Sequence, residues 1–412
     1  MSTQIKVLCC TWNVGSASPD RSGHVTLDSW LAVTEDEANA PHVCVVCLQE
    51  VSLSPLSWIS DEWTDEITSS VCRNGRLIRF RRVRQFGIVL LIFIQPFMLP
   101  SISKIAEESV ATGVGGFLGN KGAAIIRFRL YGKSICIVGS HLSAHPENLE
   151  KRNEEFHMIC DDVKFSDPKC QLVLEHDYVF WLGDLNYRLC DDVFYAMVVK
   201  KVEGNRLDEL LGYDQLLQEQ QKGTAFVGFS EGHVTFNPTY KYDKETQQYD
   251  TSRVPSWCDR VLYRVSDEVP QHVDVTSYTS HPEHCVSDHK PVSAQLELKM
   301  AADNMRRLVE FAFPTTWICK QDALIAYSLD SDVVTSSWDW IGLYKTGWHQ
   351  LSDYVTYVWA PSKRLTRRHH VPLDNDYVPK EPGLYQLIYH SNHYKQVLGI
   401  SQHFQIELDA IV

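Results

Sequence analysis

Residues capable of acid–base chemistry follow directly on an apolar run in the stretch WLGDLNYRL, residues 181–189. The apolar run Tyr178–Leu182 predicts a buried strand. After it come the carboxylate of Asp184, the carboxamide of Asn186 and the guanidinium of Arg188. A polar turn with a capping residue explains one such group. Three of them within five residues indicate a site that grips an anion and activates water against it.

The same pattern recurs at the ends of other predicted strands in the first 300 residues. The polar residues at these ends are Asn13, Glu50, His141, Asp259, Asp288 and His289. One such residue is ordinarily a cap or a turn former. Five such strand ends in one region favour a shared site, because ligands of open α/β sheets bind at one edge of the strands.

The residue types at these ends predict metal-assisted hydrolysis of a phosphate ester. Glu50 and Asn13 offer hard oxygen donors, too few for a calcium cage and suited to Mg²⁺, which keeps waters in its shell. Asp184 can accept a proton from water, and Asp259 can orient the imidazole of His289. The basic residues available to balance phosphate charge are Lys121, Arg188, Lys241, Arg253 and Arg260. A cysteinyl-phosphate mechanism is not expected.

Two loops leave alternatives open. The segment TGVGGFLGNKGAA, residues 112–124, places five glycines around Lys121 but lacks the spacing of a nucleotide-binding P-loop. It is either a flexible hairpin or a loop whose backbone and lysine approach a phosphate closely. The segment FNPTYKYD, residues 236–243, is either a proline-initiated turn or a loop that places Tyr240 and Lys241 at the rim of a substrate site.

The net charge of −13 argues against a nucleic-acid partner held by general basicity, so an anionic substrate must meet a local positive site. The segment Arg73–Arg84 carries six arginines. We expect a solvated strand or loop face there, with a membrane-facing patch as the alternative.

Several features predict a cytoplasmic protein. The run Phe86–Phe97 is too short to span a bilayer and is expected to be a buried strand, and the N-terminal residues do not resemble a secretory signal. Most of the twelve cysteines lie in apolar runs. Cys44 and Cys47 have C-x-x-C spacing, but residues three apart in a strand point to opposite faces. We therefore expect reduced core cysteines.

The chain divides into two regions that differ in their pattern of predicted secondary structure. Up to residue 302 it alternates strand-like and helix-like segments, with helices expected over 149–165 and 205–223 and a closing strand over 292–300. Residues 308–412 consist of short alternating strands separated by turn formers, which predicts a small all-β sandwich. The short junction predicts two domains in contact.

The motifs WLGDLNYRL and VPSWCDRVLYR closely resemble the two defining motifs of the inositol polyphosphate 5-phosphatases. TWNVG, LQE, GNKGA, SHLSAH, NPTYKYD and SDHKPV follow that family's order over residues 5–300. The resemblance implies a four-layer, DNase I-like α/β sandwich. It also implies Mg²⁺-dependent removal of the 5-phosphate from phosphoinositides, such as phosphatidylinositol 4,5-bisphosphate and 3,4,5-trisphosphate, or from soluble inositol phosphates.

The resemblance also implies roles for individual residues. Asn13 and Glu50 would hold the metal, and Asp184 and Asn186 would prepare the attacking water. His289, supported by Asp259 and preceded by Asp288, would bind the scissile phosphate, with His141 on the leaving-group side. Tyr240, Lys241 and Arg253 would hold the neighbouring 4-phosphate. Apart from the resemblance, the other residues expected to bind the substrate are Asn120, Lys121, Arg188 and Arg260. Phe117 and Leu118 would touch the lipid surface.

The loop before Arg253 is shorter than in many family members and carries one basic residue fewer, which bears on recognition of the 4-phosphate.

The region after residue 308 resembles the SKICH domain that a subset of these phosphatases carries, with SSWDWIGLYK and DYVTYVWA as the matching segments. The resemblance implies peripheral placement at membranes or a protein partner. Two other functions are consistent with the motifs. One is a catalytically weak phosphoinositide-binding scaffold that acts through the SKICH-like domain, and the other is a related DNase I-like phosphodiesterase.

Overall fold

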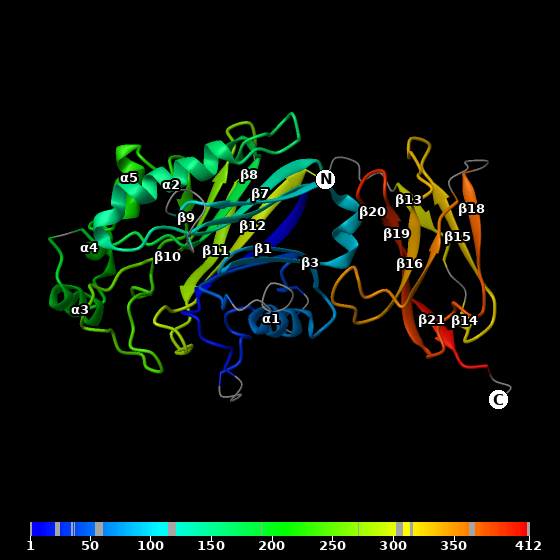
Figure 1. Cartoon of the computed structure of the whole chain (residues 1–412), viewed down its shortest axis with the longest axis horizontal. Helices are drawn as coiled ribbons and strands as arrows, with labels where there is room; N and C mark the ends of the chain where they lie inside the picture. Colours follow the sequence, from blue (N-terminus) through cyan, green and yellow to red (C-terminus); the bar gives the residue numbers. More distant parts are fainter. Residues whose placement is uncertain are drawn as a thin grey trace.

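Two six-stranded sheets lie face to face in the first 301 residues, with helices on their outer faces (Figure 1). The computed structural model describes residues 2–20, 25–33, 36, 38–53, 61–113, 121–190, 192–270, 272–301, 308–313, 316–361 and 367–409. In Figure 1, α1 lies below the pair of sheets and α2 and α5 lie above it.

The first sheet has the strand order β11-β12-β1-β2-β4-β3. Strand β1 is parallel to β2 and antiparallel to β12. The strands are β1 (Ser2–Asn13), β2 (Val43–Gln49), β3 (Ile78–Gln85), β4 (Ile88–Ile94), β11 (Val273–Ser280) and β12 (Val292–Ala301).

The second sheet has the order β5-β6-β7-β8-β10-β9. Strand β7 is parallel to β8, and β10 is antiparallel to β8. The strands are β5 (Ile102–Ala111), β6 (Gly122–Leu130), β7 (Lys133–His141), β8 (Tyr178–Asp184), β9 (Ser230–Glu231) and β10 (Asp259–Val265).

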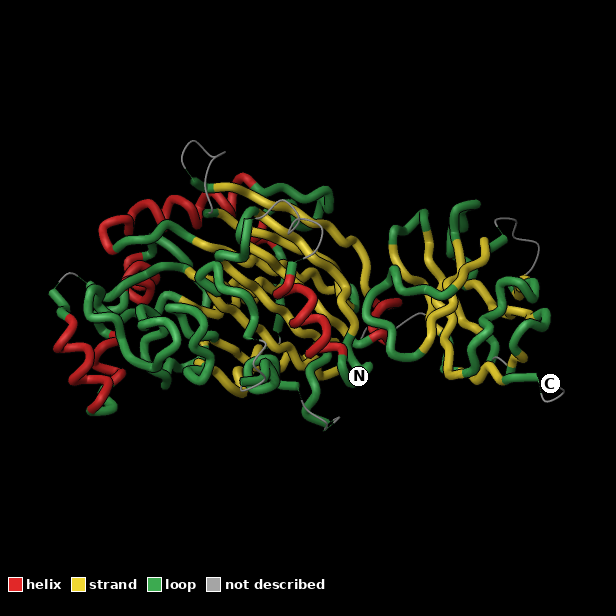
Figure 2. Tube along the Cα trace, turned by 60° about the horizontal axis from the view of Figure 1, so that its bottom comes forward, coloured by secondary structure: helices red, strands yellow, loops and turns green. Residues whose placement is uncertain are grey.

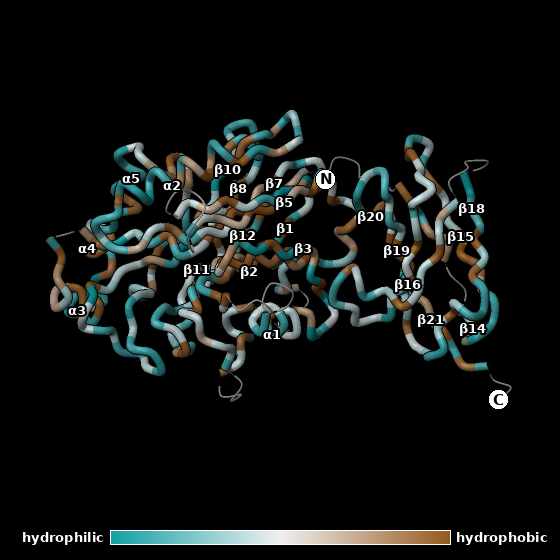
Figure 3. Tube along the Cα trace, in the orientation of Figure 1, coloured by the Kyte–Doolittle hydropathy of each residue, from teal (hydrophilic) through white to brown (hydrophobic). Residues whose placement is uncertain are grey.

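The alternation of side chains along each central strand builds two cores at once. In β1, Val7 and Cys9 face the core between the two sheets, whereas Leu8 and Cys10 face a second core beneath α1. Both faces of these strands are covered, which is why they read as continuous apolar runs. Figure 3 shows these runs as brown segments in the middle of the sheets. The predicted four-layer α/β sandwich is confirmed.

The described helices connect strands of the two sheets. They are α1 (Glu62–Cys72), α2 (Leu149–Asp162), α3 (Tyr195–Glu203), α4 (Leu207–Leu211) and α5 (Gln215–Lys222), with short 3-10 turns η2 (Pro96–Ser101), η3 (Pro146–Asn148) and η4 (Val173–Glu175). None of the described helices is long and apolar enough to cross a bilayer.

The helix predicted over 149–165 is confirmed as α2, but the single helix predicted over 205–223 is wrong. The chain breaks between α4 and α5 because Asp214 caps α5, accepting a hydrogen bond from the N–H of Leu217 at 3.1 Å. The expected stop is correct: Gly223 ends α5 in the left-handed conformation, with φ of +77°.

The C-terminal region forms two further sheets around a separate core (Figure 2). One has the order β13-β15-β18 and the other β14-β21-β19-β16-β17, with β20 paired to β19. The strands are β13 (Val309–Phe311), β14 (Trp317–Ile318), β15 (Ala323–Leu329), β16 (Trp340–Lys345), β17 (Thr356–Trp359), β18 (Arg368–Leu373), β19 (Gly383–Ser391), β20 (Gln396–Ile400) and β21 (Phe404–Glu407). The predicted all-β region is confirmed.

The two regions share an apolar contact. Tyr344, Trp348 and Ile388 of the C-terminal region belong to the same cluster of buried residues as the core between the first two sheets. The backbone N–H of Arg79, at the start of β3, donates to the carbonyl of His349 at 2.6 Å. The contact lies at the start of β3 and next to η2, on the side where β1 begins (Figure 1).

The arginines of the segment 73–84 form specific contacts rather than a simply solvated face. Arg81 pairs with Glu107 at 3.1 Å and Arg82 with Asp61 at 3.0 Å. The guanidinium of Arg79 contacts Thr68 and Gln350. These contacts leave the alternative of a membrane-facing patch without support.

All twelve cysteines are free thiols, and ten of them are buried. Cys44 and Cys47 lie in different core clusters, on opposite faces of β2, as predicted. The buried strand expected over 86–97 is confirmed as β4, whose seven residues are all buried.

Candidate active site

The polar strand ends meet at one edge of the two sheets. Asn13 is the last residue of β1, and Glu50 directly follows β2, its parallel neighbour. In the second sheet, Asp184 lies in register with His141 on one side and with Asp259 on the other. Residues in register on neighbouring strands point to the same face, so these three side chains are held side by side.

Asp184 lies at the centre of the group. Its Oδ2 atom is 2.9 Å from Nδ2 of Asn13 and 3.1 Å from Nε2 of His141. Its Oδ1 accepts a hydrogen bond from the backbone N–H of Asn186 at 3.1 Å. Burial by itself raises the pKa of Asp184, but the nearby His289 and His141 lower it far below its usual range. Asp184 is therefore ionised at neutral pH.

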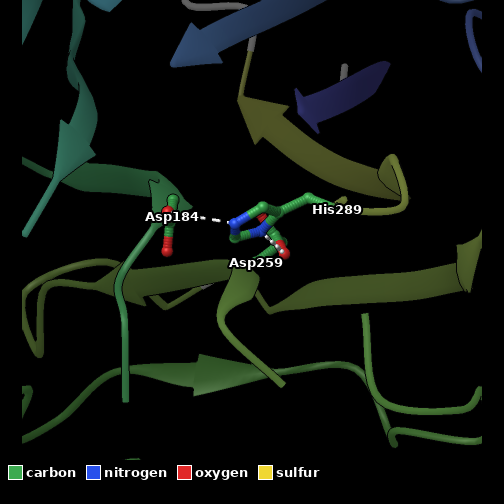
Figure 4. Close-up of side chains that lie close together, drawn as sticks. All are labelled: Asp184, Asp259 and His289. Carbon is green, nitrogen blue, oxygen red and sulfur yellow. Dashed lines mark hydrogen bonds and ion pairs between the residues drawn. The ribbon is translucent and has the colours of Figure 1, made fainter. Parts of the chain in front are cut away.

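His289 lies beside Asp184 on a loop that leads into β12 (Figure 4). Its Nδ1 is 2.9 Å from Oδ2 of Asp259, and its Nε2 is 3.8 Å from Oδ2 of Asp184. Burial lowers the pKa of His289, but the carboxylates of Asp259 and Asp184 outweigh it and raise the pKa to about 9. The ring is thus an imidazolium at neutral pH, and its Nε2–H is available to an anion.

Glu50 and Asn13 form an acidic corner next to this pair. Nδ2 of Asn13 is 3.2 Å from Oε1 of Glu50, while its Oδ1 accepts a hydrogen bond from the N–H of Gly15 at 3.0 Å. The side chain of Glu50 is 35% exposed. Two carboxylates, from Glu50 and Asp184, thus converge on one amide, and hard oxygen donors of this kind fit a divalent cation.

Asp184, Asp259 and His289 also place one ligand atom each within 4.8 Å of one another. A protonated imidazole has no lone pair for a metal, so the fit is better at Glu50 than at His289.

His141 and Lys121 complete this corner. The ammonium of Lys121 contacts Nε2 of His141, whose Nδ1 is buried and makes no hydrogen bond to any described residue. Burial lowers the pKa of both groups. Each can therefore exchange a proton more readily than its ordinary value would allow.

A stack of cations and an aromatic ring borders the site. The ring of Tyr240 lies 4.4 Å from the ring of His289, and the guanidinium carbon of Arg188 lies 4.3 Å from the ring of Tyr240. Arg188 also contacts the side-chain oxygen of Asn186, whose Nδ2 donates to the carbonyl of Leu142 at 3.0 Å. Asn186 thus has both ends of its amide engaged and holds Arg188 in place.

The remaining predicted residues are spread more widely. Lys241 pairs with Asp250 at 2.8 Å, and Arg253 is exposed. Asp288 is half-buried between the loop of Gly15 and that of Tyr242. Asn120, Phe117 and Leu118 lie outside the described residues.

The structure contradicts one predicted substrate contact, that of Arg260. Its guanidinium is fully buried between Asp214, at 3.0 Å, and Glu231. Arg260 follows Asp259 in β10, so its side chain points to the opposite face of the sheet. It therefore stabilises the packing of the start of α5 and of β9 against β10.

Sequence reasoning missed three buried residues that hold this site together. The hydroxyl of Thr239 donates to Oδ2 of Asp259 at 2.7 Å, and the indole N–H of Trp12 donates to the carbonyl of His289 at 3.0 Å. The hydroxyl of Ser287 donates to the carbonyl of Asn13 at 2.7 Å. All three lie inside the motifs NPTYKYD, TWNVG and SDHKPV, so the signal was position within a motif rather than residue chemistry.

Two family models match the chain. Residues 10–295 match Endonuclease/Exonuclease/phosphatase family 2, and residues 309–406 match the SKICH domain. The human phosphatidylinositol 4,5-bisphosphate 5-phosphatase A is 34% identical over 424 residues, which are 98% of this chain and 42% of that protein. The chain thus spans about two fifths of the length of that relative. The mouse inositol polyphosphate 5-phosphatase K is 31% identical, and the match covers 98% of this chain and 90% of that protein.

Solved structures agree with these matches. The inositol polyphosphate 5-phosphatase domain of a synaptojanin, in complex with inositol (1,4)-bisphosphate and a calcium ion, superposes with a TM-score of 0.64 at 31% identity. The match covers 73% of this chain and 86% of that domain. A nitrophorin from Cimex, 23% identical with a TM-score of 0.58 over 72% of this chain and 99% of its own, shares the fold.

Proposed function

Because the chain belongs to endonuclease/exonuclease/phosphatase family 2, and within it to the inositol polyphosphate 5-phosphatases that carry a SKICH domain, we propose that it is a Mg²⁺-dependent 5-phosphatase. Its proposed substrates are phosphatidylinositol 4,5-bisphosphate and 3,4,5-trisphosphate, together with soluble inositol polyphosphates. The proposed boundaries are a catalytic domain of residues 1–302 and a SKICH domain of residues 308–412.

One observation supports this function most directly. A buried imidazolium, that of His289, lies 3.8 Å from a buried carboxylate, that of Asp184, at the edge where Glu50 and Asn13 converge. The pair offers a donor to a phosphoryl oxygen and an acceptor for a proton of water within one site.

In the proposed reaction, Oδ2 of Asp184 accepts a proton from the attacking water, because the carboxylate is held ionised. The Nε2–H of His289 donates to an oxygen of the 5-phosphate, and Asp259 keeps the imidazolium charged as negative charge develops on the phosphoryl group. His141 and Lys121 are proposed to protonate the leaving alkoxide. Mg²⁺ held by Glu50, with Asn13 and Asp184 beside it, would supply positive charge against the phosphate oxygens.

Tyr240, Lys241 and Arg253 are proposed to contact the neighbouring 4-phosphate. The ammonium of Lys241 is 2.8 Å from Asp250, so binding of this phosphate would require Lys241 to exchange one anionic partner for another. The aromatic ring of Tyr240 contributes by ordering both Arg188 and His289.

We further propose that the protein associates peripherally with membranes, from the cytoplasmic side, where its lipid substrates lie. Phe117 and Leu118 are proposed to touch the lipid surface. The SKICH domain would provide placement or an as yet unidentified protein partner. It packs on the side where β1 begins, away from the strand ends that form the site.

The test is release of inorganic phosphate from short-chain phosphatidylinositol 4,5-bisphosphate, with Mg²⁺ and with a chelator. The Asp184→Ala variant should lose at least about 10²-fold in kcat, since it lacks the proton acceptor. Unchanged turnover in this variant would refute the mechanism. Nicking of plasmid DNA in place of phosphate release would indicate a phosphodiesterase.

A further inference from the structure

Ser287 lies at the junction between the two halves of the site without reaching the site itself. It is fully buried in the loop between β11 and β12. Its hydroxyl donates to the backbone carbonyl of Asn13 at 2.7 Å and accepts from the backbone N–H of His289 at 3.2 Å. A serine hydroxyl has one proton to donate, so this single group serves both neighbours.

The two neighbours belong to different parts of the chemistry. The side chain of Asn13 contacts the carboxylates of Glu50 and Asp184, on the proposed metal side. The side chain of His289 contacts Asp259, on the phosphate side. Ser287 therefore links the backbone positions of both sides through one hydroxyl.

The surroundings of this hydroxyl are closely packed. A Cβ atom on Gly15 would lie 3.0 Å from the Oγ of Ser287, so the two loops already pack at contact distance there. Gly15 has a φ of +54°, a conformation that glycine adopts freely. On the other side of the loop, the indole of Trp12 holds the carbonyl of His289. The N–H and the carbonyl of His289 are thus both anchored to the end of β1, the former through Ser287.

We propose that Ser287 is a positioning residue that sets the separation between the imidazolium of His289 and the carboxylate of Asp184. This inference rests on the proposed 5-phosphatase function. Loss of the hydroxyl frees the His289 backbone from Asn13 and leaves a buried N–H without its partner. The imidazolium then samples positions away from the phosphoryl oxygen. Displacements of about 1 Å at a reacting group reduce turnover by up to about 10²-fold.

The experiment compares Ser287→Ala with Ser134→Ala in the full chain. Ser134 is also buried, and its hydroxyl also donates one bond and accepts one, to and from Asp177, at 2.7 and 2.9 Å. It lies at the start of β7, the end of that strand opposite His141. Each variant therefore loses two hydrogen bonds. Those of Ser287 lie next to the site, and those of Ser134 lie far from it.

On short-chain phosphatidylinositol 4,5-bisphosphate with Mg²⁺, Ser287→Ala is expected to lower kcat by about 10-fold or more with KM within about twofold of the wild type. Ser134→Ala should keep the kcat of the wild type. An unchanged kcat in Ser287→Ala, or an equal loss in both variants, would overturn the positioning role.

Ser287→Cys gives a second measurement if Ser287→Ala does not fold, because the thiol fills the space of the hydroxyl with a somewhat larger atom and weakens both bonds. We expect folded Ser287→Cys to have a kcat between that of the wild type and that of an Asp184→Ala control. A kcat equal to that of the wild type would overturn the inference. Absence of phosphate release by the wild type itself would instead refute the proposed function, so the two failures are distinguishable.

Discussion

Nδ1 of His289 lies 2.9 Å from Oδ2 of Asp259, although the two residues flank strands of different sheets. Asp259 begins β10 in the second sheet, and His289 precedes β12 in the first. The contact therefore ties the two sheets together at the site and fixes the charge of the imidazole.

Replacement of Asp259 by Asn should make the site more sensitive to alkali. The carboxylate of Asp259 helps raise the pKa of His289 to about 9, so its removal lowers that pKa and the imidazolium is lost at a lower pH. We expect the alkaline limb of kcat/KM to move toward acid by about 1–3 pH units. Phosphate release measured from pH 5 to pH 10 checks this. An alkaline limb that stays in place would show that another group sets it.

Replacement of Glu50 by Gln should weaken the response to Mg²⁺. The carboxamide keeps the shape of the side chain but removes one of the two carboxylates at the proposed metal corner. We expect the Mg²⁺ concentration for half-maximal activity to rise at least about 10-fold. The control is Glu154→Gln, an exposed residue of α2, which should leave the titration unchanged. Equal Mg²⁺ dependence in both variants would remove Glu50 from the metal shell.

The stacking of Tyr240 on His289 and Arg188 can be tested by substitution. Tyr240→Leu removes the ring that contacts His289 and Arg188 and is expected to lower kcat/KM about 10-fold. Tyr240→Phe keeps the ring and should retain the wild-type kcat, within about threefold, on short-chain phosphatidylinositol 4,5-bisphosphate. If the Phe and Leu variants lose activity equally on that substrate, the hydroxyl rather than the stack is responsible.

Much of this architecture could be predicted from the sequence, for reasons that are local. Strands such as β8 and β12 and the helix α2 follow from apolar periodicity, which the cores then satisfy. The break between α4 and α5, where Asp214 caps α5, was missed because the leucines on either side keep the period of a single helix, and the ion pair between Asp214 and Arg260, 46 residues apart, is not visible in any local pattern.

The candidate site divides in the same way. The pairing of Asn13 with Glu50, and of His141 with Asp184, was predictable from polar residues at strand ends, since parallel neighbours end at one edge. Arg260 shows the limit of that argument. Proximity in the sequence to Asp259 suggested a role in substrate binding, yet strand alternation turns its side chain to the opposite face. The hydroxyls of Thr239 and Ser287 act through bonds to residues distant in the chain, which no local pattern reveals.

The burial of His390 predicts how the stability of the C-terminal domain responds to acid. The imidazole stacks on Trp340 with ring centroids 3.8 Å apart, and burial lowers its pKa to about 3. Below the unfolded-state pKa of about 6.5 the unfolded chain takes up a proton that the folded one does not, so stability falls as the pH is lowered from 7 toward 3. The loss from this group between pH 7 and pH 5.5 is about 1 kcal/mol.

Hydrogen exchange of β19 at the two pH values, corrected for intrinsic exchange, measures this loss. The His390→Phe variant keeps an aromatic ring against Trp340 but does not titrate, so its β19 should lose less stability than the wild type over the same interval. If both proteins lose the same amount, other groups control the acid response of the domain.

Residues from the two sheets form one site, and we propose that this site splits a phosphomonoester at the inositol 5-position. The most direct test is identification of the lipid product after incubation of short-chain phosphatidylinositol 4,5-bisphosphate with the protein and Mg²⁺, in parallel with Asp184→Ala. We expect phosphatidylinositol 4-phosphate and free phosphate from the wild type, and at most about 1% of these amounts from the variant. Phosphatidylinositol 5-phosphate as the product, or equal product from both proteins, would contradict it.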